Sequence, residues 1–281
     1  MSQLSLVFFT VLAQSAVGFF IALGFVQLLA RPHEKAMNWA FLSTFVLLGL
    51  GAIASITHLG HPLRMFNVAF GLAHLSPLSL EIVGLSLFGG AAATYTGMRL
   101  FNILAHLQQL MLLAAMVLGV VFILLIAQVY TLATVPTWNS GWTSFQFLMT
   151  AGVIGPMAAV TALRWQQNAV GEQYTKIITN GLSVANIMMM VIAITGYVGY
   201  LFWLASLEAH SNPLTMVDGA ATMAMVRVFL MMATILTVAI GTIRGSKSKI
   251  IPSVAVVLLL LTEIVGRAFF YDIYLSAGAG M

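Results

Sequence analysis

The chain has 281 residues, of which 61% are hydrophobic and only 6% are charged, and its mean hydropathy is +1.03. This small share of charged residues cannot cover a water-exposed surface. The composition therefore excludes a soluble globular protein and indicates an integral membrane protein. The formal charge of +4 is not arranged as a basic stripe interleaved with exposed aromatic residues, which argues against a nucleic-acid partner. The sequence has no cysteine, which excludes disulfides and a thiolate-bound iron–sulfur cluster within this protein.

Long apolar runs divide the sequence into about eight segments, each long enough to cross a bilayer as an α-helix, which takes about 20 residues. We therefore expect an all-α, polytopic membrane bundle that forms one domain over residues 1–281. The run that starts at Leu4 lacks a basic leading segment and is too long for a signal peptide, so we expect it to be a retained first helix. The predicted spans are 4–30, 36–59, 79–98, 103–129, 143–164, 176–206, 222–243 and 250–275.

Basic residues predict the orientation of these spans, because cytoplasmic connections of membrane proteins are rich in Lys and Arg. The odd-numbered connections hold nearly all of them, whereas the even-numbered connections hold only Arg64. We therefore expect both termini on the outer side of the membrane, opposite the cytoplasm. The residues that place the odd-numbered connections in the cytoplasm are Arg31, Lys35, Arg99, Arg164, Lys176, Arg244, Lys247 and Lys249.

With this topology, several ionisable residues of the apolar runs fall in the outer half of the membrane, where charged groups are costly and usually functional. Gln14 in the first span lies at a similar depth. Polar groups gathered at one depth suit a ligand with a polar head on an apolar body, and a quinol fits this description. The ionisable residues are His58, Glu81, Arg227, Glu263 and Arg267.

Quinol oxidation releases protons and electrons, so its site needs a proton acceptor near the ring hydroxyls and a path to bulk water. Histidine titrates near neutral pH, which makes His58 the candidate acceptor. Glu81 would pass the proton outward, while Arg227 or Arg64 would hold the carboxylate or a carbonyl oxygen. We expect no metal site.

Simpler interpretations compete with these roles. Glu263 and Arg267 are spaced i, i+4 on one helix face, which favours a structural ion pair between them. Arg64 lies near the interface and could bind lipid phosphate or a partner surface instead of a ligand. His58 could be a solvated or capping residue at a helix end. In that case the protein would be a purely structural anchor.

Two other classes of function have less support from the sequence. A haem held by two histidines needs a facing pair inside the membrane, but only His58 falls at that depth, so we expect no haem. A transporter could also gather intramembrane charges, but the sequence shows no inverted repeat and its polar residues lie off the midplane.

The segment around His58 reads His58-Leu-Gly-His-Pro-Leu-Arg64-Met-Phe-Asn67, with Glu81 following. This pattern resembles the DMSO reductase membrane anchor subunit, the DmsC family. His61 departs from the small polar residue expected in the family, and the segment before Glu81 is slightly longer than the family pattern. Supporting matches elsewhere are Phe9-Thr-Val-Leu-Ala-Gln14, Thr134-Val-Pro-Thr-Trp138 and Glu263-Ile-Val-Gly-Arg267.

The resemblance implies an eight-helix anchor in the bacterial inner membrane with both termini periplasmic. This anchor would hold a molybdopterin catalytic subunit and an iron–sulfur electron-transfer subunit on the periplasmic face. It also implies menaquinol as substrate, with no cofactor bound permanently, and it matches His58 and Glu81 to the family's quinol-site histidine and acidic residue. The terminal reduction would then occur in another subunit, while this one carries the quinol-oxidising site. An anchor of a related tetrathionate, polysulfide or selenate reductase remains an alternative.

Overall fold

A computed structural model describes residues 3–32, 34–58, 76–170, 172–207 and 213–274. Within these residues every regular element is a helix, and eight helices are long and apolar enough to cross a membrane. The predicted all-α bundle with eight spans is therefore confirmed. The long helices are α1 (Gln3–Leu29), α2 (Glu34–His58), α4 (Pro77–Leu100), α5 (Ala105–Tyr130), α6 (Gly141–Trp165), α8 (Glu172–Ala205), α10 (Ala220–Ile243) and α11 (Ile250–Asp272).

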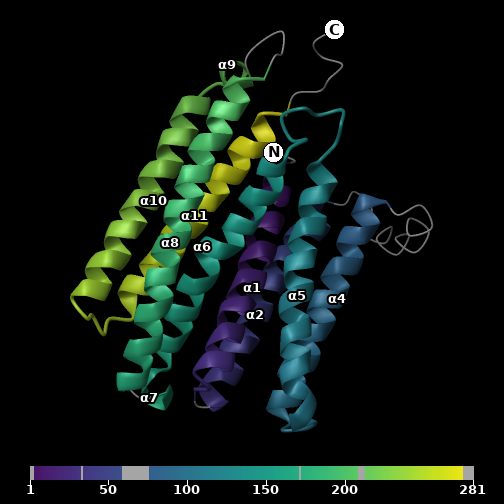
Figure 1. Ribbon diagram of the computed structural model, residues 1–281. Coiled ribbons are helices and arrows are strands. Elements are labelled where there is room, and N and C mark those ends of the chain that lie inside the picture. The colour runs from purple at the N-terminus through teal and green to yellow at the C-terminus, as the bar shows by residue number, and fades with distance from the viewer. Residues whose placement is uncertain (1–2, 33, 59–75, 171, 208–212, 275–281) are drawn as a thin grey trace.

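The long helices alternate in direction, so α1 begins and α11 ends at the same end of the bundle (Figure 1). We call this the terminal end and the opposite one the basic end. The one-turn helix α7 (Gln167–Val170) lies at the basic end, and α9 (Pro213–Met216) at the terminal end. Which end faces the periplasm stays a prediction from the charge pattern.

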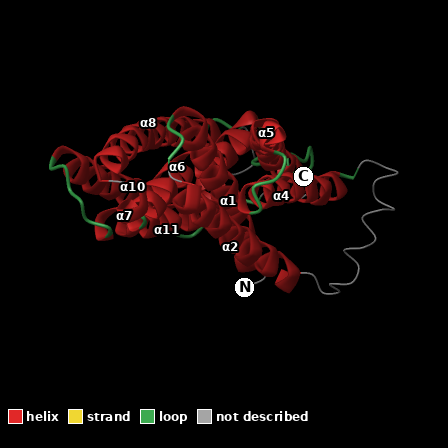
Figure 2. Cartoon of the chain, turned by 90° about the horizontal axis from the view of Figure 1, so that it is seen from below, coloured by secondary structure: helices red, strands yellow, loops and turns green. Residues whose placement is uncertain are grey.

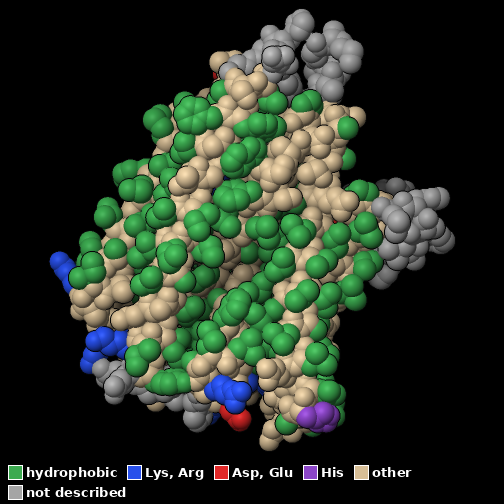
Figure 3. Space-filling model, in the orientation of Figure 1, with side chains coloured by type: hydrophobic (Ala, Val, Ile, Leu, Met, Phe, Trp, Pro, Cys, Tyr) green, Lys and Arg blue, Asp and Glu red, His purple; other side chains and the backbone are tan. Residues whose placement is uncertain are grey.

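Lys and Arg side chains gather along the lower edge of the molecule, while the face above them is largely hydrophobic (Figure 3). This edge is the basic end, where the turns between α1 and α2, α4 and α5, α6 and α8, and α10 and α11 lie. Eight of the eleven Lys and Arg residues fall at these turns. Such a distribution is expected for a bundle whose sides contact lipid and whose basic turns lie in water.

Helices α1 and α6 form the centre of the bundle (Figure 2). Helices α2, α4 and α5 lie on one side of this pair, and α8, α10 and α11 lie on the other. A Cβ added at Gly18 of α1 would lie 2.7 Å from the carbonyl carbon of Ala151 in α6, and one at Gly155 would lie 2.8 Å from the Cα of Gly18. Small residues thus let the two backbones meet, as expected for helix packing in membranes.

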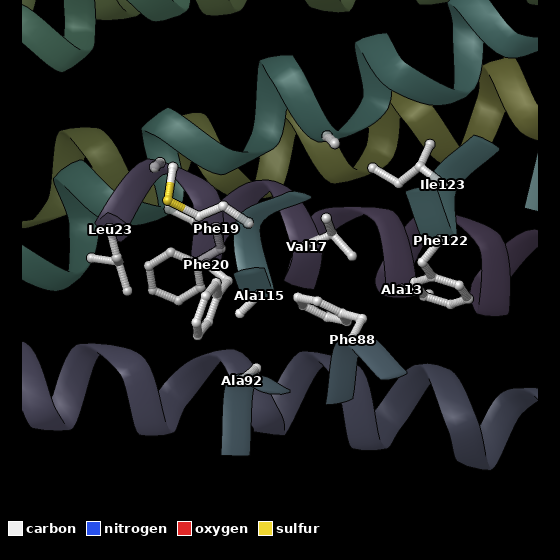
Figure 4. Close-up of a cluster of buried hydrophobic side chains, with 14 of the residues drawn as sticks. Ala13, Val17, Phe19, Phe20, Leu23, Phe88, Ala92, Ala115, Phe122 and Ile123 are labelled. Atoms are coloured by element: carbon white, nitrogen blue, oxygen red, sulfur yellow. The ribbon is translucent and has the colours of Figure 1, made fainter. Parts of the chain in front are cut away.

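Aromatic rings fill the core between α1, α2, α4 and α5 (Figure 4). The ring centroids of Phe20 and Phe41 are 5.1 Å apart, and those of Phe41 and Tyr95 are 5.0 Å apart. Phe88 stacks on Phe122 at 6.1 Å, which joins α4 to α5. Apolar packing therefore holds these four helices together along their middle turns.

Candidate functional site: a buried polar cluster near the terminal end

Arg227 of α10 and Glu263 of α11 form a buried ion pair. The Nη2 atom of Arg227 lies 3.2 Å from each carboxylate oxygen of Glu263, and the two side chains are only 6% and 2% exposed. Arg227 also lies with its Cζ atom 4.3 Å from the ring centre of Tyr197 in α8. Inside a membrane an ion pair persists only when its remaining donors and acceptors find partners, and the neighbouring helix α6 supplies several.

Helix α6 contributes two polar side chains spaced i, i+4, so both face α10 and α11. Arg227 Nη1 donates to Gln146 Oε1 at 3.3 Å, and Thr150 Oγ1 donates to Glu263 Oε2 at 2.7 Å. Gly266 of α11 makes room for the arginine, because a Cβ there would lie 2.5 Å from Arg227 Cζ. The ion pair therefore depends on a glycine as well as on charged residues.

Arg267, one turn beyond Glu263 on α11, has different partners. Its Nη2 atom donates to Gln14 Oε1 of α1 at 2.8 Å and to Thr150 Oγ1 at 3.1 Å. Its Cζ atom lies 3.6 Å from the ring centre of Phe147, a short cation–π contact. The described contacts pair Glu263 with Arg227 of α10, while Thr150 forms hydrogen bonds to both Glu263 and Arg267 and the two charges on α11 also interact electrostatically.

A pair of tyrosines lies beyond Arg267. Tyr271 OH donates to Tyr130 OH of α5 at 2.8 Å, and both residues are buried. The Arg267 guanidinium interacts electrostatically with both hydroxyls, and so does the carboxyl group of Glu81 in α4. The two hydroxyls are therefore influenced by charges on both α4 and α11.

The connection from α5 to α6 is fastened to the end of α11 beside this pair. Trp138 Nε1 donates to the carbonyl of Phe270 at 2.7 Å, and its ring stacks on Phe270 with centroids 5.2 Å apart. Thr137 Oγ1 donates to the carbonyl of Ile273 at 2.9 Å. The Thr134–Trp138 motif found in the sequence thus closes the terminal end above the tyrosines.

The structure brings together several of the residues predicted from sequence. Gln14, Arg227, Glu263 and Arg267 belong to one contiguous cluster, and Glu81, which is 6% exposed, interacts electrostatically with Tyr271 next to that cluster. His58 is the last residue of α2, but its side chain is not among those described. Arg64 lies outside the described residues. All of the described members occupy the half of the bundle nearer the terminal end.

Sequence reasoning missed Gln146, Thr150 and Tyr271. The first two are polar residues spaced i, i+4 within an apolar run, and Tyr271 continues the i, i+4 series from Glu263 through Arg267. Each spacing places side chains on one helix face and could have indicated a polar seam. The donor atoms Gln14 Nε2, Gln146 Nε2 and Arg267 Nε are buried without a hydrogen-bond partner among the described residues.

Comparison with known proteins gives a consistent result. The family model described as "DMSO reductase anchor subunit (DmsC)" matches residues 1–273. The C subunit of the anaerobic dimethyl sulfoxide reductase of Haemophilus influenzae is 31% identical over 281 residues, which covers 98% of this protein and 96% of the relative.

Two proteins of Escherichia coli strain K12 are also similar. The YnfH subunit of an anaerobic dimethyl sulfoxide reductase is 30% identical over 281 residues, with 97% of this protein and 95% of the relative covered. The C subunit of the anaerobic dimethyl sulfoxide reductase is 30% identical over 283 residues, with the same coverage. The eight spans, the polar cluster and the match along nearly the whole sequence lead to one conclusion: this protein belongs to the DMSO reductase anchor subunit (DmsC) family.

Proposed function

We propose that this protein anchors a DMSO-reductase-type respiratory complex in the bacterial inner membrane and oxidises menaquinol near its terminal end. The electrons pass to an iron–sulfur subunit and from there to a molybdopterin catalytic subunit, both docked at that end on the periplasmic face. Its relatives are subunits of anaerobic dimethyl sulfoxide reductases, which supports dimethyl sulfoxide as the terminal acceptor over the tetrathionate, polysulfide and selenate alternatives. Membership of an anchor-subunit family also favours an anchor over a transporter.

The observation that carries the proposal is the position of Glu81. This carboxyl group is buried in α4 close to the terminal end and interacts with the hydroxyls of Tyr130 and Tyr271. A buried carboxyl group near one end of the bundle can take a proton and release it toward water at that end. His58 ends α2 at that end of the bundle, which supports its role as the first proton acceptor.

The reaction balances without a cofactor held by this protein. Menaquinol loses two electrons and two protons and becomes menaquinone, with the protons leaving through His58 and Glu81. Because the electrons depart at the same end as the protons, no electron carrier needs to cross the bilayer. Arg227 forms an ion pair with Glu263 inside the bundle, so it is less suited to bind the quinol than the sequence led us to expect. The side-chain oxygen of Gln14 already accepts a hydrogen bond from Arg267. We assign both a supporting role, and we leave Arg64 as a candidate ligand.

The test is menaquinol-analogue oxidation by membranes that contain the assembled complex, with His58→Ala and Glu81→Gln compared at equal complex levels. Matched controls are His106→Ala and Glu34→Gln, which change the same residue types at exposed positions of the basic end. We expect the first two variants to lose quinol-linked activity while reduction driven by an artificial donor to the catalytic subunit continues. Full quinol activity in both would instead establish a purely structural anchor.

A further inference from the structure

A second polar site lies at the basic end, far from the cluster described above. A cavity of about 270 Å³ opens there between the end of α1, the end of α4 and the beginning of α5. None of the described residues that line it is Asp or Glu, so two arginine charges face it without a carboxylate. Its polar lining consists of Gln27, Arg31, Tyr95, Arg99, Gln108 and Gln109.

Arg99 is held in place on one edge. Its Nε atom donates to Asn38 Oδ1 at 2.9 Å, and its Nη1 atom donates to Tyr95 OH at 3.3 Å. The guanidinium carbon also lies 5.9 Å from the ring centres of Phe41 and Tyr95. These contacts leave the hydrogens of Nη2 for another acceptor. An arginine fixed in this way loses little entropy when it binds a planar or tetrahedral oxyanion.

The beginning of α5 adds backbone donors to the same cavity. This 26-residue helix starts at Ala105, which lines the cavity, and it has neither a capping side chain nor an acidic residue in its first turn. The first N–H groups of a helix carry a partial positive charge and have no partner within the helix. Such an end binds phosphate readily when basic side chains accompany it.

Strained backbone surrounds the cavity. Three residues other than glycine have positive φ in the described part of the sequence: Arg31 at 45°, Asn102 at 51° and Leu104 at 50°. The first lines the cavity, and the other two form the turn that presents Ala105 to it. Conformations of this kind cost free energy, and they occur at ligand sites as well as at the ends of helices.

One buried acceptor also belongs to the lining. Gln27 Oε1 is inaccessible to solvent and accepts no hydrogen bond from a described residue. Gln108 Nε2, by contrast, donates to the carbonyls of Met98 at 3.1 Å and Ile103 at 3.2 Å, which builds the wall of the cavity. Because Gln27 Oε1 is closed off from the cavity, the charged groups that face a ligand there are the two arginine donors, which suits an oxyanion.

The size of the cavity separates it from the other polar hollow at the basic end. The hollow beside Arg164 has a volume of about 30 Å³, enough for one or two water molecules. The volume of the cavity beside Arg99 is about nine times larger (270 against 30 Å³).

The turn next to the Arg99 cavity exposes apolar side chains, with Phe101 76% and Ile103 50% exposed, which is expected where a turn lies in the membrane interface.

From these observations we infer that the cavity at Arg31 and Arg99 binds a phosphate group at the basic end of the bundle. The phosphate oxygens accept from both guanidinium groups and from the N–H groups at the start of α5 that precede Leu107, whose own N–H donates to the carbonyl of Leu104. The source is either the headgroup of an anionic phospholipid or free phosphate. Basic pockets between membrane helices are known to bind lipid headgroups.

Native mass spectrometry of the purified complex tests this inference. The complex is stripped of lipid with detergent and titrated separately with phosphatidylglycerol and with inorganic phosphate. We expect one phosphate-bearing ligand to bind, and we expect Arg31→Gln with Arg99→Gln to weaken it about tenfold or more. The control Arg244→Gln removes an exposed charge from a different turn of the same end and should leave the affinity unchanged.

The two arms distinguish the sources. Binding of phosphatidylglycerol that inorganic phosphate does not displace identifies a lipid site, whereas displacement at millimolar phosphate identifies a site for the free anion. Gln109→Glu, an exposed position on the cavity wall, provides a second variant that does not disturb the contacts of Arg99 and should also weaken binding. Equal affinity in the double arginine variant, Gln109→Glu and the Arg244→Gln control would overturn the inference.

Discussion

Arg227 and Glu263 meet inside the bundle with one guanidinium nitrogen 3.2 Å from both carboxylate oxygens. The two residues come from neighbouring helices and lie 36 positions apart in the sequence. Since both side chains are almost entirely buried, the free energy of each charge depends on the other and on Gln146 and Thr150. The first prediction concerns this dependence.

Replacing Glu263 with Gln should destabilise the protein by about 3–5 kcal/mol, because Arg227 is left as a buried charge without a carboxylate. The double variant Arg227→Gln with Glu263→Gln removes both charges and should recover a large part of this loss. Thermal unfolding of the purified complex in detergent measures both. A double variant no more stable than Glu263→Gln alone would show that the charges are not coupled.

Gly266→Ala should also destabilise the protein, although it changes no charge. The added methyl group would occupy the space of the Arg227 guanidinium, so the arginine must leave its present position, and overpacking of this kind costs about 1–3 kcal/mol. Gly97→Ala in α4 is the matched control, because a Cβ there meets nothing within 4 Å. The melting temperatures of the two variants should differ clearly, with the control at or above that of the natural protein.

Gly18→Ala should weaken the contact between α1 and α6. The new Cβ would meet the backbone of Ala151, which lacks the freedom of a flexible side chain to move aside. We expect a lower yield of folded protein in membranes and a lower melting temperature. Gly90→Ala provides the comparison, because its Cβ would lie in open space. Equal yields of the two variants would contradict the close approach of α1 and α6.

Tyr271→Phe removes the hydroxyl that donates to Tyr130, and the hydrogen bond is worth about 1 kcal/mol of stability. If the tyrosines position the Glu81 carboxyl for proton release, quinol oxidation should slow while the artificial-donor activity stays unchanged. Tyr274→Phe, at a position 53% exposed, is the control. A shift in the pH profile of quinol oxidation in Tyr271→Phe alone would separate positioning of Glu81 from a purely structural role.

Much of the fold followed from hydropathy, because each span is an apolar run long enough to cross the bilayer. The predicted span 103–129 became Ala105–Tyr130, and 250–275 became Ile250–Asp272. The observed helix ends differ from the predicted ends by a few residues, because a helix can continue past the apolar run into polar residues and stops only where a turn begins. The turn at Leu104, for example, delays the start of α5.

The polar cluster was only partly predictable. Depth in the membrane follows from position along a span, so Gln14, Arg227, Glu263 and Arg267 were expected near one another. Which side chains pair is decided by how helices face each other, and spacing along one helix cannot show that. For this reason Glu263 was paired with its neighbour on α11 instead of with Arg227, and the linking role of Thr150 was missed.

The hydroxyl of Thr150 touches both Glu263 and Arg267, while Arg267 reaches α1 and Glu263 reaches α10. Sliding α11 along the bundle by one helical turn, about 5.4 Å, would therefore separate every one of these partners at once. Apolar packing alone would allow such a shift, because similar apolar side chains recur at each turn of the helix. The polar cluster thus fixes the positions of α1, α6, α10 and α11 relative to one another along the axis of the bundle.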